Sequence, residues 1–594
     1  MRVFTTIQSS LFVLLTTLTV AEAFLDTDQK CQLSIFTPFS TWWNNQTYSA
    51  VGLFNVFSNA TTIGHSQLAA AIMAAQQFND RDTSVVADLA DLTTDCNVQF
   101  DLDNLLVYNS GETRYSASQA LFRAETKPCA IVGPYTDRIA NQLSVLALAG
   151  EIPHVVTRSY SLDVASDYLH PFTSSVYPDL RISARKVADY LLFKGRIDSV
   201  AILYDLNDVG PQRFEALKGE FQLRNIGHLG FSFIENIPEF GLDSALFPPL
   251  EALREIQNRG FRTIVFCLDD PLVSLQDVAD AIVELGMDDG EHFFVFHDQF
   301  EPRLYVEEPN ENITSVVLGS AWILALPEFH FHPELPFMQS WKNQGDDTVE
   351  FLNAINPIQD ESSVGYIFAG EDFFQTVEPE YGAGFMFDAV MAVGIGACQA
   401  EKAADGTISS AAHQAAIREI NFTSSTGRLS FGEDTPDRNG AREDDTVPFV
   451  AVNFVTEELG SFASPEIIFP GEQWKSISNT SFIYRDGTTF PPKNLRRPPK
   501  QNYLSKGLRI FGFTLMSISM AFGLASGIWV FVCRKHRILA ASQPVFLYLI
   551  CFGTIVQSSS IVTISFDESY GWTKNQLDKS CVSVGFQWLM FLPT

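Results

Sequence analysis

The chain has 594 residues, of which 46% are hydrophobic, and 39 basic against 70 acidic residues give a formal net charge of -31. This length and apolar content are enough for several domains with sizeable cores, and they exclude wholesale disorder and a small disulfide-stapled scaffold. The acidic balance argues against nucleic acid as a partner, because a negative surface repels phosphate backbones. Eight cysteines allow isolated disulfides in an oxidising compartment but no cysteine-rich module.

The first 23 residues have the pattern of a secretory signal peptide. Arg2 supplies a positive charge, an apolar stretch is centred on residues 11–15, and Ala21-Glu22-Ala23 is a small-residue cleavage motif. The alternative, a buried N-terminal helix, would need an amphipathic period that this stretch lacks. We therefore expect the mature chain to begin at Phe24, outside the cytoplasm.

Short β-rich runs alternate with helical stretches over the next several hundred residues. The expected strands are 130–133, 154–156, 199–204, 263–266 and 293–296, and the expected helices include 66–79, 137–149, 182–193 and 278–285. This alternation predicts doubly wound α/β domains, with ligand sites at the carboxyl ends of the strands. None of the motifs GxGxxG, Walker A, HExxH, CxxC or GxSxG lies on these elements, so we expect a protein that is not an enzyme and that has no cofactor or metal.

The C-terminal part predicts membrane helices. Residues 510–532 form an uncharged run, which at about 1.5 Å per residue crosses an apolar layer of about 30 Å and predicts a helix over 510–533. A second helix is expected over 544–566. A third, over 581–594, is too short to span, so the sequence is expected to stop inside it.

Orientation follows from three signals. The basic cluster 534–537 favours a cytoplasmic loop after the first span, although basic residues also precede that span. A long domain led by a signal peptide crosses regardless of such charges, so we place 24–506 outside. Sequons in this region, which need the lumen, lie at Asn45, Asn59, Asn312, Asn421 and Asn479.

Several segments resemble the type I periplasmic-binding-protein fold of receptor ectodomains. The resemblance rests on residues 129–134, 152–161, 178–181, 200–205, 387–390, 420–431 and 437–440. It implies a bilobed clamshell over 24–490, with lobe one at about 24–175 and 318–400 and lobe two at about 176–317 and 415–490. A juxtamembrane linker would cover 491–507, and the start of a seven-helix membrane domain 508–594.

A clamshell followed by several spans resembles the class C (family 3) G-protein-coupled receptors. Ser542-Gln543-Pro544 opens the second span and Cys581 the third, as in that class. The absence of cysteine between Cys398 and Cys533 leaves no room for a cysteine-rich domain, so the closer likeness is to metabotropic GABA-B-type receptors. Trp474 and residues 486–492 are similar to the joining segment of that branch.

The resemblance implies a lobe-one disulfide between Cys96 and Cys129, against the alternative of two free thiols. Cys267 and Cys398 are expected to be buried core residues rather than bonded. Five ectodomain cysteines leave an odd one, Cys31, unpaired or intermolecular. The partner of Cys581 would lie beyond the sequence.

The fold and the resemblance together predict the ligand site. One expected strand is followed by Tyr135, Thr136 and Asp137, and the next is followed by segment 157–161, which contains Ser159 and Ser161. Both segments should face the cleft from lobe one. Their hydroxyl and N–H groups suit a carboxylate, at the N-terminus of helix 137–149. From lobe two, segment 298–302 is similar to one that supplies an aromatic contact, here Phe300. Ordinary turn chemistry is the alternative explanation for all of these residues.

One departure leaves the ligand open. Amino-acid-binding relatives carry an acidic group just before the helix that contains Asp388, where this chain has 381–384, Tyr-Gly-Ala-Gly, with Glu380 nearby. Acidic residues that could substitute are Asp205, Asp208 and Glu301. The expected ligand is therefore an amino acid or related carboxylate other than GABA, or none if the chain serves a dimer partner.

The resemblance implies a multi-pass plasma-membrane receptor that forms a homo- or heterodimer through lobe one and couples to a heterotrimeric G protein. The alanine-rich helix 66–79 is one candidate dimer face, and internal packing is the alternative role for that helix. Two alternatives stay open. A receptor cyclase shares the clamshell, but the second span argues against it. A membrane-tethered binder or partner subunit would need no signalling bundle.

Overall fold

The protein is described by a computed structural model that divides it into two compact units, residues 1–497 and 498–594. The structure describes residues 24–25, 30–37, 60–92, 96–102, 106–109, 128–134, 137–159, 161–164, 166, 168–206, 209–234, 248–268, 271–297, 311–330, 332–354, 370, 372–404, 406–432, 440–455, 462–477, 481–493, 506–541 and 543–565. The expected signal peptide and third membrane helix lie outside these ranges.

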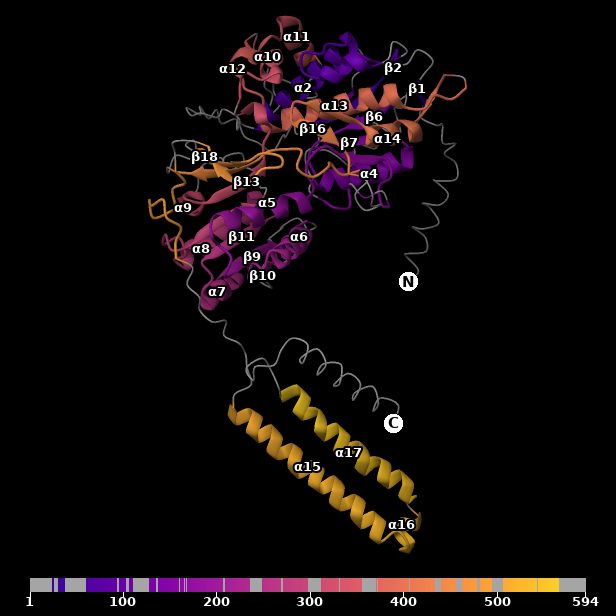
Figure 1. Ribbon diagram of the computed structural model, residues 1–594, viewed down its shortest axis with the longest axis vertical. Coiled ribbons are helices and arrows are strands. Elements are labelled where there is room, and N and C mark those ends of the chain that lie inside the picture. The colour runs from indigo at the N-terminus through magenta and orange to yellow at the C-terminus, as the bar shows by residue number, and fades with distance from the viewer. Residues whose placement is uncertain are drawn as a thin grey trace. The chain divides into compact units, whose positions relative to one another are not determined.

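The first lobe is built on a five-stranded parallel sheet. Its main elements are β3 (Leu33–Thr37), β5 (Leu106–Asn109), β6 (Ala130–Val132), β7 (His154–Val156), β8 (Thr173–Ser175), α2 (Ala60–Asp80), α4 (Asp137–Gly150), α13 (Tyr381–Gln399) and α14 (Ser410–Glu419). The strand order is β5-β3-β6-β7-β8. Figure 1 labels β6 and β7 of this sheet together with the helices α2, α4 and α13. Ala130 and Val132 pack with α2 and α13, whereas Ile131 between them packs on α4. Helices therefore cover both faces, which is why the strands are continuous apolar runs.

Smaller elements complete this lobe. They are β1 (Phe24–Leu25), which pairs with β14 (Ile408–Ser409), β2 (Lys30–Cys31), which pairs with β4 (Gln99–Phe100), β15 (Asn421–Ser424), which pairs with β16 (Gly427–Ser430), η1 (Ala87–Asp91), η7 (Glu328–His330), α10 (Pro336–Lys342), α11 (Asp346–Ala354) and α12 (Phe373–Thr376).

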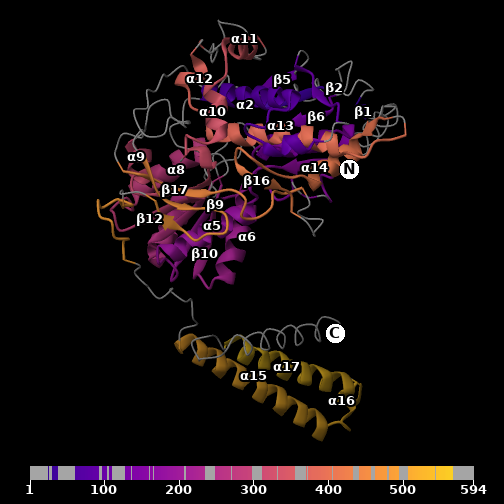
Figure 2. The ribbon, with the colours of Figure 1, turned by 45° about the horizontal axis from the view of Figure 1, so that its top comes forward.

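The second lobe is built on an eight-stranded mixed sheet with the order β10-β9-β11-β12-β13-β17-β18-β19. Its elements are β9 (Val200–Asp205), β10 (His228–Phe233), β11 (Thr263–Cys267), β12 (Phe293–His297), β13 (Ala321–Ala325), β17 (Phe449–Phe454), β18 (Phe462–Ile468), β19 (Lys475–Ser476), α5 (Leu180–Phe193), α6 (Gly210–Leu223), α7 (Pro249–Arg259), α8 (Pro271–Glu284) and α9 (Glu311–Val317). Strands β9 to β13 are parallel, and β17 to β19 are antiparallel. Alternate residues of β9 pack on opposite sides, Ile202 with α5 and α6 and Leu203 with α7 and α8. Figure 2 labels β9, β10 and β12 of this sheet together with α5, α6 and α8.

The chain crosses between the lobes three times, after β8, after β13 and after β16. Two predicted boundaries differ from these positions. β13 was expected in lobe one, yet it pairs with β12 and β17 of the second sheet. α14 packs on α13 and β8, so lobe one extends past residue 415. A buried strand has the same continuous apolar pattern in either sheet, so its sequence does not determine which strand it pairs with.

The structure pairs Cys31 with Cys129 and Cys96 with Cys398, at Cα–Cα distances of 5.3 and 5.2 Å. The prediction of a Cys96–Cys129 bond is therefore wrong, as are the expectations that Cys31 is odd and Cys398 unbonded. Cys31 and Cys129 precede the paired strands β3 and β6, with Leu33 opposite Ala130, and so become neighbours. Cys398 comes near the end of α13, which packs against α2. Cys267 is free and buried, as predicted.

The second unit contains two long apolar helices. They are α15 (Lys506–Val532) and α17 (Pro544–Ser565), which pack together and are joined by α16 (Arg537–Ala541). Ser558 Oγ donates to Ser519 Oγ at 2.9 Å between them. The stretch Ile510–Val532 is long and apolar enough to cross a membrane. Gly382–Gln399 of α13 also has that length and composition, but it is mostly buried inside lobe one.

Candidate functional site

Two loops follow strands β6 and β7 at the carboxyl edge of the first sheet. Residues 133–134 continue β6 and residues 157–164 continue β7, and the described parts of both loops are largely buried. Thr157 Oγ1 donates to the Pro134 carbonyl at 3.0 Å, which ties one loop to the other. Below them His154 Nε2 lies 2.7 Å from the Gly133 carbonyl oxygen. Burial lowers the pKa of His154 to about 4, so this imidazole is neutral at pH 7 and donates to the carbonyl.

Asp137 connects these loops to α4, of which it is the first residue. Its Oδ1 accepts two hydrogen bonds, from Ser159 Oγ at 2.5 Å and from the Ser161 backbone N–H at 2.9 Å. All three residues are buried, with exposures of 8%, 3% and 3%. A carboxylate at a helix N-terminus is also favoured by the helix dipole. The predicted residues Ser159 and Ser161 are therefore brought together by an acidic side chain.

Ser161 has a second, distinct feature. Its Oγ is buried, and among the described residues it has no hydrogen-bond partner. A buried hydroxyl without a partner costs about 1–3 kcal/mol, so such groups are rare in native structures. The loop consequently holds one polar atom that a bound molecule could satisfy.

Lobe two touches this loop through Gln212, in the first turn of α6. The Leu162 backbone N–H donates to Gln212 Oε1 at 3.3 Å, and Gln212 Nε2 donates to Asp163 Oδ2 at 3.3 Å. α6 begins shortly after the carboxyl end of β9. The carboxyl edges of the two sheets therefore face one another here, as the family resemblance predicts.

The carboxyl edge of the second sheet carries a buried polar cluster below Gln212. Arg213 Nη1 donates to the His297 carbonyl at 2.9 Å, and Ser183 Oγ lies 2.5 Å from His297 Nε2. Burial, with Arg213 nearby, holds the pKa of His297 well below its usual value, so the ring is neutral. Burial raises the pKa of the neighbouring Cys267 to about 12, which makes this thiol unreactive. Asp205, at the end of β9, is fully buried in the same edge.

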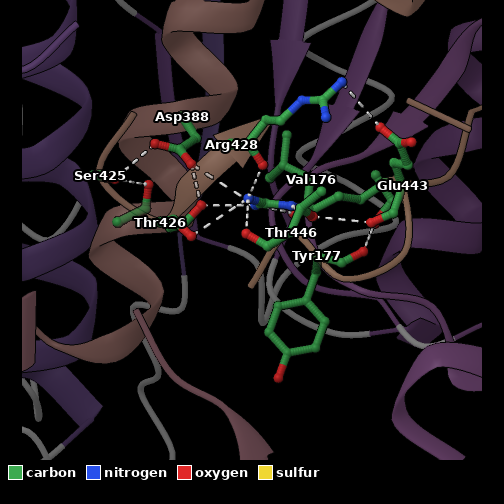
Figure 3. Close-up of polar contacts among 11 residues, drawn as sticks. Val176, Tyr177, Asp388, Ser425, Thr426, Arg428, Glu443 and Thr446 are labelled. Atoms are coloured by element: carbon green, nitrogen blue, oxygen red, sulfur yellow. Dashed lines mark hydrogen bonds and ion pairs between the residues drawn. The ribbon is translucent and has the colours of Figure 1, made fainter. Parts of the chain in front are cut away.

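A second polar cluster holds the crossovers together (Figure 3). Arg442, on the third crossover, is fully buried and donates to the Val176 carbonyl of the first crossover at 3.0 Å. It also donates to Thr426 Oγ1 at 2.7 Å and to the Arg428 carbonyl at 2.7 Å. Its Nη1 lies 3.9 Å from Asp388 Oδ2 on α13.

The charges of this cluster are balanced within the protein. Burial raises the pKa of Asp388, although Arg442 and donated hydroxyl hydrogen bonds from Thr426 and Ser425 act in the opposite direction. Burial lowers the pKa of Arg442 to about 10, so the guanidinium stays charged at pH 7. No sequence motif marks Arg442, and sequence analysis did not single it out.

The other predicted site residues separate into two groups. Tyr135, Thr136 and Phe300, with Asp208 and Glu301, lie outside the described residues. Glu380 is buried against α2, where it accepts from Gln67 Nε2 at 3.2 Å. Of the predicted glycosylation sites, Asn312 and Asn421 lie on the described surface, and Asn421 is exposed. Asn45, Asn59 and Asn479 lie outside the described ranges.

The chain was compared with known families and proteins. Residues 67–446, more than half of the chain, match the family described as the receptor family ligand binding region. A search of curated proteins found no match. The matched range contains strands β5 to β8 of the first sheet and β9 to β13 of the second, together with the lobe-one loops and the crossovers up to residue 446. Domains of this family bind small-molecule ligands in a membrane or extracellular location. This protein therefore belongs to the family of receptor ligand-binding regions.

Proposed function

We propose that the protein is a membrane receptor that binds a small, amino-acid-sized extracellular ligand between its two lobes and signals through G proteins in the manner of GABA-B-type receptors. The role is binding rather than catalysis. The observation that carries the proposal is the contact of Gln212 with the 162–163 loop, because it brings the lobe-one residues Ser159 and Ser161 to the face of lobe two. A ligand held there contacts both lobes and favours their closure.

The crossover cluster supports a hinge at the other side of the site. Arg442 joins the first and third crossovers through hydrogen bonds whose acceptors are carbonyls and hydroxyls. Such a fully bonded charged group fixes the crossovers to one another, so the lobes can rotate about them without the crossovers separating.

Residues 482–485, near the end of the proposed extracellular unit, pack on lobe two. Asn453 Nδ2 donates to the Ile483 carbonyl at 3.1 Å, and Arg485 Nη2 donates to Ser315 Oγ at 2.8 Å. Lys194 Nζ lies 4.1 Å from the Phe482 ring centroid. This segment precedes α15 in the sequence, so a movement of lobe two would pull on the chain that leads to the proposed membrane helices. The large exposed apolar side chains of α15, such as Phe522 and Trp529, favour a lipid environment.

The binding step can be tested on the full chain in detergent. Amino acids, amines and small carboxylates would be titrated while the thermal unfolding midpoint is followed, since a ligand of the native state raises that midpoint. We expect at least one class to raise it, and Ser161→Ala to weaken the effect. A chain that binds none of them would instead favour the role of a partner subunit.

The signalling and topology steps need separate tests. Guanine-nucleotide exchange in membranes from cells that express the chain should rise with the ligand found above; no rise would favour a tethered binder. Glycosidase treatment should increase gel mobility through sites such as Asn421. An unchanged mobility, with an extracellular unit that external protease cannot reach, would contradict the proposed topology.

A further inference from the structure

The lobe-one loop was expected to bind a carboxylate, because it combines hydroxyl and N–H donors. In the structure those donors already have an acceptor of the same chemistry. Asp137 Oδ1 receives the Ser159 hydroxyl at 2.5 Å and the Ser161 N–H at 2.9 Å. The side chain of Asp137 thus occupies the position that a ligand carboxylate would take.

We propose that the lobe-one half of the site is an acceptor site, which takes an ammonium group or a neutral donor such as a hydroxyl, and not a carboxylate. This inference rests on the proposed function and narrows its ligand class. A ligand carboxylate would compete with Asp137 for the same two donors and would bring a second negative charge beside the first. Like charges that share one site cost free energy, because one of them must be protonated or displaced.

Other charges near the loop agree with this assignment. Asp163 lies in the loop itself, and the fully buried Asp205 ends the facing strand β9. Among the described side chains, the cations Arg158 and Arg213 are close by in sequence or structure, and both have contacts within the protein. The guanidinium carbon of Arg158 lies 5.7 Å from the Tyr177 ring centroid, and Arg213 donates to the His297 carbonyl. The net charge of -31 adds a long-range attraction for cations.

Ser161 supplies the second, independent observation. Its Oγ is buried and has no hydrogen-bond partner among the described residues. The backbone N–H of the same residue donates to Asp137 Oδ1, so the Ser161 hydroxyl and the Asp137 carboxylate belong to neighbouring parts of one site. A hydroxyl oxygen accepts as well as donates, so a ligand ammonium or hydroxyl can satisfy it while facing Asp137. An amino acid stays a candidate ligand only with its ammonium group toward this loop.

The test uses four compounds with the same four-carbon chain and different ends: 1,4-butanediamine, 1,4-butanediol, 4-aminobutanoate and butanedioate. Each is titrated against the full chain in detergent by thermal shift. We expect the diamine or the diol to bind at least about tenfold more tightly than butanedioate, a difference of about 1.4 kcal/mol. Asp137→Asn should reduce the preference for the diamine about tenfold and raise the affinity for butanedioate.

Two variants separate ligand recognition from a structural effect. Asp289→Asn is the matched control, because Asp289 also accepts one backbone N–H, from Glu291, and one side-chain contact, from His292. Asp289 lies before β12, at the amino edge of the second sheet and away from the proposed site. It should leave the order of affinities unchanged. Ser159→Ala loosens Asp137 but keeps its charge, so the preference for the diamine should persist.

The outcomes decide between the inference and the function on which it rests. If butanedioate binds the wild-type chain as tightly as the diamine, the acceptor site is wrong while the ligand-binding role stands. Binding of butanedioate only after Asp137→Asn would support the inference, because it shows that Asp137 excludes a carboxylate. If no compound binds either protein, both the inference and the proposed function lose their support.

Discussion

Two aspartates of lobe one have similar surroundings and different positions. Asp388 and Asp137 are both buried, and both accept hydrogen bonds from serine or threonine hydroxyls. Asp388 lies beside Arg442, whose bonds reach two crossovers. Asp137 instead binds a loop that touches lobe two through Gln212. The comparison indicates that position relative to the lobes, rather than the type of side chain, separates the proposed hinge role of Asp388 from the proposed ligand-site role of Asp137.

The largest difference should appear when Arg442 is removed. Arg442→Met leaves Asp388 charged and buried without its cation, so the unfolding free energy should fall by about 3–5 kcal/mol in denaturant titrations. The double variant with Asp388→Asn should be more stable than Arg442→Met alone, because it no longer buries an unpaired carboxylate.

Arg428→Met is the matched control for this change. Arg428 pairs with Glu443 at 3.6 Å, and these side chains are 55% and 45% exposed. An exposed pair contributes about 0–1 kcal/mol, so the loss should be correspondingly small. Equal losses for Arg428→Met and Arg442→Met would contradict the hinge assignment.

The contributions of His154 and Asp388 to stability should depend on pH with opposite signs. Burial lowers the pKa of His154, under the Asp137 loop, to about 4 from its usual 6.5. Its contribution to stability is therefore present above pH 6.5 and is lost as the pH falls toward 4, by at most about 3 kcal/mol. The pKa of Asp388 is raised by burial, so its contribution falls as the pH rises above the usual aspartate value.

His154→Gln should flatten the acid limb of a plot of unfolding midpoint against pH. The flattening should be partial, because burial also lowers the pKa values of His413 and His330, to about 4 and about 3. His332→Gln, at a side chain that is 45% exposed, is the control. A His154→Gln profile that matches the control between pH 6.5 and 4 would rule out this role for His154.

The sequence predicted much of this arrangement, but not its contacts. Continuous apolar runs such as 263–266 identified buried parallel strands, and the structure confirms β11 there. Ser159 and Ser161 were found because loops after parallel strands meet at one edge. That Asp137 accepts both of their donors depends on side-chain directions that no periodicity encodes. Arg442 and the cysteine pairs depend on contacts between distant segments, and sequence spacing does not determine such pairings.

The smallest expected effect concerns the contact between the lobes. Gln212→Ala removes two hydrogen bonds of 3.3 Å that form only where the 162–163 loop meets α6. One of these hydrogen bonds is exposed and the other is partly buried. Together they contribute about 1 kcal/mol, so the closed state should be less populated and ligand affinity roughly five- to tenfold weaker. The ligand-free unfolding midpoint should change little, because neither core loses a contact.

Gln276→Ala is the matched control: Gln276 is a glutamine on α8 whose Nε2 donates to Asp280 within the same helix. It should bind ligand like the wild type. If Gln212→Ala keeps full affinity in the same titration, ligand closure does not pass through this contact, and the lobe-two side of the site must lie elsewhere along the edge formed by β11 and β12.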